Sequence, residues 1–226
     1  MPGRHRGGLP IFALSKFAFV PRSGKIGDII HLPDLRQQYN YSCGAIAMLA
    51  VCEYFGVGPE DENSIIQQLG TSEQGTDPSL ILALGHKLGL EVLHAGALTL
   101  DQLKKYLDKQ QPVIVLIQAW YEDEAMYAEG KTDFAANNDG HYVVAIGYDK
   151  DKVYFEDPSL KGTRGELKHE EFEQRWHDEG ADGRKYDNWG IVFYRKERVE
   201  PIKGNRKAKS HNRLVSFLKP HTNGVK

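Results

Sequence analysis

The chain has 226 residues, 40% of them hydrophobic, which is enough for one sizeable core or two small lobes. Its 29 lysine and arginine residues nearly balance 31 aspartate and glutamate residues, so the body has no positive field that would attract nucleic acid. No apolar run approaches the roughly 18 residues that span a bilayer, and no cleavable secretory signal is recognisable. These features predict a cytoplasmic protein without a transmembrane segment.

The first half of the chain is predicted to be mainly helical. Residues 1–30 contain several glycines and are expected to form an N-terminal extension. The next element is an apolar helix that Asn40 or Ser42 can cap and that Gly56 ends. Helices are expected at residues 43–55, 61–69, 78–88 and 99–108, with a short strand at 90–93.

The second half is predicted to be mainly strand. The sequence PVIVLIQ is β-branched and too short for a lone core helix, and two later strands joined by a DKD turn form a hairpin. Strands are expected at residues 112–118, 141–148, 152–156 and 190–194, with a helix at about 168–177. The order predicts an α+β fold, with a helical lobe at about 33–110 and an antiparallel sheet lobe at about 111–195.

Two segments fall outside this pattern. Residues 121–140 are polar and long for a connection, so they are expected to be a functional or a mobile loop. From residue 195 onward, ten basic residues stand against two acidic ones, with few apolar residues. The tail over 196–226 is therefore predicted to be solvated and flexible, and contact with an acidic partner or membrane surface is the alternative.

The chain has two cysteines, Cys43 and Cys52, nine residues apart on the same predicted helix. They would face opposite sides of that helix and cannot bond to each other. Their spacing matches no zinc-ligand pattern, so neither a metal nor another cofactor is expected. Cys43 opens the helix, where partial positive charge favours the thiolate, and Gly44 leaves the backbone open to a substrate.

Attack of a thiolate on a carbonyl also needs a base, a group that orients the base, and donors for the oxyanion. His141 begins a predicted strand and is expected at the sheet edge, outside the core. Asp157 ends the other strand of the same hairpin, so the two side chains should be neighbours, with the carboxylate orienting the imidazole. Gln37 and Gln38, just before the cysteine, both qualify by type as oxyanion donors.

Three motifs together resemble the C39 family of papain-like cysteine peptidases, over about residues 33–195. They are Gln37 placed six residues before the pair Cys43-Gly44, the sequence GHYVV at 140–144, and the pair Asp157-Pro158. The family includes leader-removing domains of bacteriocin exporters and stand-alone C39-like proteins. The resemblance implies a helical lobe packed against an antiparallel sheet, a triad of Cys43, His141 and Asp157, and Gln37 rather than Gln38 as the oxyanion donor.

The sequence departs from the exporter-linked members in three respects. The interval of 98 residues from Cys43 to His141 is longer than in those members, and the loop over 121–140 can absorb the excess. Ser42 stands where they often carry aspartate. No transporter segment is recognised after the domain, so the resemblance does not by itself imply their double-glycine leader as the substrate. The Gly7-Gly8 pair is expected to be ordinary tail glycine.

The resulting hypothesis is a cysteine peptidase that acts on a peptide or protein substrate. The same residues could pass the acyl group to an amine instead of water, which would make the protein an acyl or peptidyl transferase. A non-catalytic papain-like binding module is the alternative from a different class.

Overall fold

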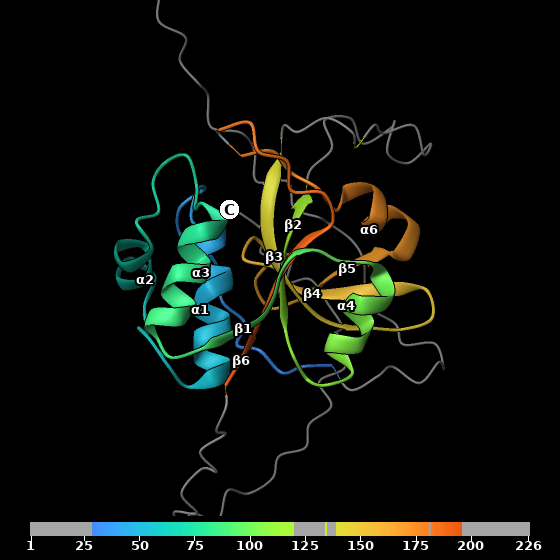
Figure 1. Cartoon of the computed structure of the whole chain (residues 1–226), viewed down its shortest axis with the longest axis horizontal. Helices are drawn as coiled ribbons and strands as arrows, with labels where there is room; N and C mark the ends of the chain where they lie inside the picture. Colours follow the sequence, from blue (N-terminus) through green and yellow to red (C-terminus); the bar gives the residue numbers. More distant parts are fainter. Residues whose placement is uncertain (1–28, 120–133, 135–138, 181, 196–226) are drawn as a thin grey trace, which may run out of the picture.

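The computed structural model describes residues 29–119, 134, 139–180 and 182–195. The predicted tail, most of the predicted extension and most of the loop over 121–140 lie outside these residues. Across the described chain, a central sheet is flanked by helices on both sides, with α1, α2 and α3 on one side and α4 and α6 on the other (Figure 1). The helices are α1 (Cys43–Phe55), α2 (Glu62–Leu69), α3 (Pro78–Lys87), α4 (Leu100–Leu107) and α6 (His169–Arg175).

The sheet has six strands within the described residues, in the order β1-β6-β2-β3-β4-β5, and every pair of neighbours is antiparallel. The α+β prediction is therefore confirmed. The strands are β1 (Glu91–Ala97), β2 (Val113–Gln118), β3 (Gly140–Tyr148), β4 (Lys152–Glu156), β5 (Gly165–Lys168) and β6 (Trp189–Tyr194).

Two of these strands differ from the sequence-based expectation. β1 extends to Ala97 instead of ending at residue 93, because β6 pairs along its full length. β5 was not expected, since the residues GELK have little strand propensity and only pairing with β4 makes them a strand.

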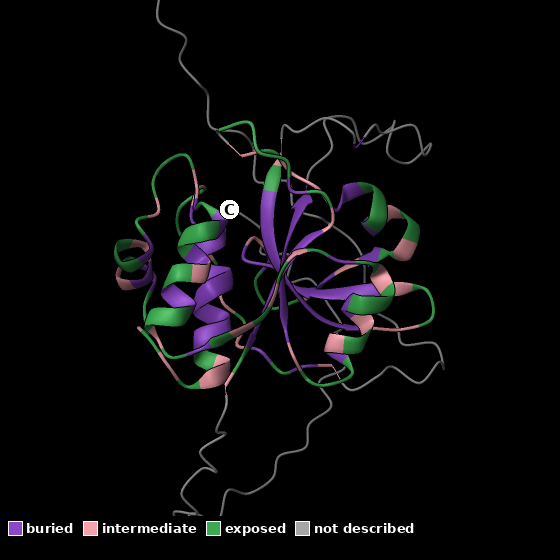
Figure 2. Cartoon of the chain, in the orientation of Figure 1, coloured by how far each residue is buried: buried purple, intermediate pink, exposed green. Residues whose placement is uncertain are grey.

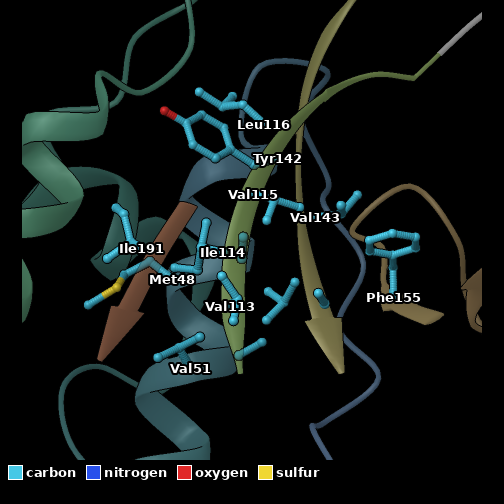
Figure 3. Close-up of a cluster of buried hydrophobic side chains, with 14 of the residues drawn as sticks. Met48, Val51, Val113, Ile114, Val115, Leu116, Tyr142, Val143, Phe155 and Ile191 are labelled. Atoms are coloured by element: carbon cyan, nitrogen blue, oxygen red, sulfur yellow. The ribbon is translucent and has the colours of Figure 1, made fainter. Parts of the chain in front are cut away.

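Helix α1 is the centre of the hydrophobic core. Every residue from Gly44 to Cys52 is buried, and several of them are alanines that let neighbouring elements approach closely. Figure 3 shows Met48 and Val51 of α1 on the same side of the sheet as Ile191 of β6, and the burial colours of Figure 2 mark the sheet as the most continuously buried layer. Each large apolar side chain buried in this way stabilises the fold by about 1.5–3 kcal/mol.

The other side of the sheet is packed by aromatic rings. Phe172 of α6 lies 5.3 Å from Phe155 of β4 and 4.6 Å from Trp176, between ring centroids. These rings hold α6 against β4 and so fix the end of the sheet at which β4 finishes.

The chain that leads to α1 is tied to the sheet. Ile30 is buried and donates its N–H to a carbonyl of β3 at 2.8 Å. Leu35 donates its N–H to the buried carboxylate of Glu156 at 3.0 Å, and Glu156 is also ion-paired with Arg164. Residues 30–37 therefore have a defined path across β3 and β4 before they reach α1. No helix in the described part of the chain is long and apolar enough to cross a bilayer.

Candidate active site

Cys43 is the first residue of α1, where the sequence predicted it. Ser42 is the N-cap residue, but its side chain makes no capping hydrogen bond to the helix. Its buried hydroxyl instead lies 2.8 Å from the carbonyl oxygen of Tyr39 and 2.6 Å from Oε1 of Glu62. The Ser42 side chain therefore leaves the backbone N–H groups of the first turn uncapped, and the positive end of the helix dipole acts on Cys43.

Gly44 brings the start of α1 against β3. A Cβ atom added at this position would lie 2.9 Å from Cβ of Thr76 and 2.9 Å from Cδ2 of Tyr142. The hydroxyl of Tyr142 donates to the carbonyl oxygen of Thr76 at 2.8 Å, which holds these two neighbours in place. A glycine after the cysteine thus allows Cys43 to approach the strand that carries His141.

His141 and Asp157 are neighbours, as the hairpin predicted. The β3–β4 register pairs Val144 with Glu156. His141 near the start of β3 and Asp157 just after the end of β4 therefore lie at the same end of the hairpin. Nε2 of His141 lies 2.8 Å from Oδ1 of Asp157, and the two residues are only 3% and 2% exposed. The expectation that His141 would stand at the sheet edge, outside the core, is wrong, because β3 lies between β2 and β4 in the sheet and His141 is buried.

The thiol and the imidazole favour each other's charged forms. Burial opposes ionisation of Cys43, but a hydrogen bond to His141, the charge on that ring and backbone hydrogen bonds with Tyr142 and Gly44 together lower its pKa below the usual 9.0. Burial likewise opposes the imidazolium, but Asp157 and Cys43 raise the pKa of His141 to about 10. Each group therefore favours the form of the other that a thiolate–imidazolium pair requires.

Cys52 has the opposite environment. It is fully buried in the core, and burial raises its pKa to about 12. Within the described residues, no group of three or more histidine, cysteine, aspartate or glutamate side chains is placed to hold a metal ion.

Gln37 lies beside the histidine–aspartate pair. Its backbone N–H donates to the carbonyl oxygen of Pro158 at 2.9 Å, and its amide Nε2 donates to the carbonyl oxygen of Tyr39 at 2.7 Å. One hydrogen of the amide is therefore engaged and the other is left for a second acceptor. Gln37 is half-buried whereas Gln38 is exposed, so the two neighbouring glutamines have different surroundings, as an extended segment predicts.

Ser159 connects Gln37 to the pair, and the sequence analysis did not identify it. Its N–H donates to Oδ1 of Asp157 at 2.8 Å, and its hydroxyl lies 3.3 Å from Nε2 of His141 and 3.4 Å from Oε1 of Gln37. The Asp-Pro-Ser sequence is typical of a turn in which the aspartate accepts from the N–H two residues later, and this signal could have indicated the residue. Gln37 is thus linked to His141 and Asp157 through the hydrogen bonds of Ser159.

The comparisons with known proteins agree with this architecture. The model of the Peptidase_C39 like family matches residues 29–182. A protein assigned as a C39-like peptidase from Bacillus anthracis has a solved structure with a TM-score of 0.58 at 16% identity, covering 77% of this chain and all of that one. The peptidase domain of Streptococcus ComA, a bifunctional ABC transporter of a quorum-sensing pathway, gives 0.50 at 19%, covering 74% of this chain and 99% of that domain.

At these identities the solved structures show a shared fold, the papain-like α+β arrangement of C39 peptidases. No protein with a curated description matches the sequence. The family match extends from the segment before Cys43 through His141 and Asp157 and takes in about two-thirds of the chain. The chain therefore belongs to the Peptidase_C39 like family.

Proposed function

We propose that the protein is a cysteine peptidase in which Cys43, His141 and Asp157 act as a triad and Gln37 donates to the oxyanion. One observation carries the proposal: Cys43 at the start of α1 interacts with a buried imidazole whose Nε2 is bound to Asp157 at 2.8 Å. Because Asp157 occupies Nε2, the ring nitrogen that serves the thiol is Nδ1. Nucleophile, base and orienting carboxylate are thus arranged in series.

The first half of the reaction forms a thioester. The Sγ thiolate of Cys43 attacks the carbonyl carbon of the scissile amide, and the carbonyl oxygen becomes an oxyanion that accepts from the Gln37 amide and the Cys43 backbone N–H. His141 then gives its Nδ1 proton to the leaving nitrogen, and the C–N bond breaks. The free amine leaves, and the acyl group remains on Cys43.

The second half releases the acid. Neutral His141 takes a proton from water, and the resulting nucleophile attacks the thioester carbonyl. Collapse of this second tetrahedral intermediate breaks the C–S bond and restores the thiolate–imidazolium pair. Asp157 keeps the ring oriented and stabilises its positive charge in both halves of the reaction.

A peptidyl electrophile tests the nucleophile directly. At neutral pH it should form one covalent adduct, located on Cys43 by mass spectrometry of digested protein, before any adduct forms on Cys52. The reason is that Cys43 has a lowered pKa whereas Cys52 is buried with a pKa of about 12. Cleavage of a peptide mixture by the untreated protein should release products with the mass of water addition. Equal modification of both thiols, or products of amine transfer only, would contradict the peptidase.

The pH dependence of kcat/KM provides a second test. Activity needs the thiolate, which forms as pH rises through a Cys43 pKa below 9.0, and the imidazolium, which is lost as pH rises through about 10. The profile should therefore be bell-shaped, with the midpoint of its acid limb below pH 9 and the midpoint of its alkaline limb near pH 10. Since Asp157 raises the pKa of His141, Asp157→Asn should move the alkaline limb to lower pH. An alkaline limb that stays in place in this variant would disprove the assignment of His141 and Asp157.

A further inference from the structure

Glu62 has an environment that its position at the start of α2 does not explain. It is only 5% exposed, yet the capping of α2 is provided by the preceding residue, Asp61, whose side chain accepts from Ser64. Glu62 forms no ion pair with any cationic residue that the structure describes. A buried carboxylate is costly unless hydrogen bonds compensate it, so its partners show what the residue does.

Those partners lie at the two ends of the connection between Gln37 and Cys43. Both carboxylate oxygens of Glu62 accept the backbone N–H of Gln38, at 2.9 and 3.1 Å, and Oε1 lies 2.6 Å from the hydroxyl of Ser42. Residues 38–42 form the connection between Gln37 and Cys43 and contain no regular secondary structure. Glu62 therefore links the beginning of this connection to its end across 24 residues of sequence.

The connection determines where two donors stand. The Gln37 amide and the Cys43 backbone N–H are the proposed oxyanion donors, and each must lie within about 2.7–3.1 Å of the developing negative charge. Gln37 is held on its other side, where its N–H meets Pro158 and its amide meets Ser159. Glu62 supplies the remaining constraint, because it fixes the residues just after Gln37 and just before Cys43.

We propose that Glu62 is a positioning residue that sets the separation of the two oxyanion donors through its hydrogen bonds to Gln38 and Ser42. This inference rests on the proposed function of the site. Glu62 touches neither the reacting thiol nor the imidazole in this arrangement, so it acts on the geometry of the donors and not on ionisation of the nucleophile.

The test compares Glu62→Met with the matched control Asp61→Ala in the full chain. Glu62→Met keeps the length of the side chain but removes both oxygens that accept from Gln38 and Ser42. Its kcat should fall by about ten- to a hundred-fold, as expected when donors are misplaced by an ångström or less, with KM changed less than about two-fold. Asp61→Ala removes the cap of the same helix and should keep kcat within about two-fold while lowering the melting temperature. In both variants Cys43 should react with iodoacetamide at the parent rate.

A double-mutant cycle with Ser42→Ala checks the proposed connection. Both substitutions break the hydrogen bond between Ser42 and Glu62, so the double variant Ser42→Ala/Glu62→Met should lose little more activity than the worse single variant. Losses in kcat that multiply would overturn the proposal, as would parent-like kcat in Glu62→Met. Loss of iodoacetamide reactivity together with kcat would show a general structural role and overturn it as well.

Hydrogen exchange provides a readout that does not depend on catalysis. Backbone amides of residues 38–42 should exchange faster in Glu62→Met than in Asp61→Ala, because the Gln38 N–H has lost its acceptor. Unchanged exchange would overturn the positioning role even if the peptidase is real. Absence of Cys43-dependent cleavage in the parent would instead overturn the proposed function, so the two failures can be distinguished.

Discussion

Replacement of Cys43 with alanine should abolish peptide cleavage, by roughly a million-fold if the residue acts as one unit with its base, as triads do. The expected size follows from the proposed chemistry, in which the only covalent bond between protein and substrate is made by this sulfur. His141 would keep its aspartate partner in the variant but would have no nucleophile to serve. Initial rates on a cleaved peptide, with product identified by mass, provide the measurement.

The matched control is the other cysteine. Cys52→Ala should retain the parent rate, because Cys52 lies in the core with a pKa of about 12 and has no part in the site. Its thiol packs as a small apolar group, so the substitution should lower the free energy of unfolding by about 1–2 kcal/mol, toward the low end of core truncations. Cleavage that survives Cys43→Ala, or disappears in a folded Cys52→Ala protein, would refute Cys43 as the nucleophile.

Gln37→Ala should lower kcat by about 100- to 1000-fold with little change in KM, which is the usual effect of removing one oxyanion donor. The Gln37 amide already gives one hydrogen to Tyr39, and the second is the one that would serve the oxyanion. Cys43 should still react with small alkylating agents at the parent rate, because no contact of the Gln37 side chain contributes to the lowered pKa of the thiol.

Two further variants make the result specific. Gln37→Glu keeps the length of the side chain and an oxygen for Ser159 but removes the N–H donors, so it should be as damaging as Gln37→Ala. Gln38→Ala should keep kcat within a few-fold of the parent. The substitution removes only an exposed side chain, and the backbone N–H of residue 38 can still donate to Glu62. A large loss of kcat in Gln38→Ala together with an active Gln37→Ala would show that Gln38, and not Gln37, is the oxyanion donor.

Local signals in the sequence were sufficient to predict the helix and the hairpin that carry the candidate site residues. The apolar run between Ser42 and Gly56 predicted α1 with its observed ends at Cys43 and Phe55. The two strands around a short turn predicted that His141 and Asp157 would meet. In both cases the deciding information lies within about 16 residues of sequence and follows from the geometry of helices and hairpins.

Other features depend on contacts between distant segments and could not be predicted in this way. The sequence offered Asn40 or Ser42 as the cap of α1, but the hydroxyl of Ser42 lies against Glu62, 20 residues away, and the Tyr39 carbonyl instead. His141 was expected at an edge because nothing in its own strand shows that β2 will cover the other side. β5 is a strand because β4 lies beside it.

The division of the site between a helix and the sheet has a consequence for damaged or newly made copies of the protein. In the proposed mechanism, the reactivity of Cys43 depends on an imidazole on β3 and on a helix end that packs against that strand through Gly44. A chain in which α1 has formed but has not docked would keep the helix end but lack the imidazole, so its thiol would attack more slowly. We therefore expect immature or partly unfolded molecules to cleave little, because the native packing is what brings the thiol and the imidazole together.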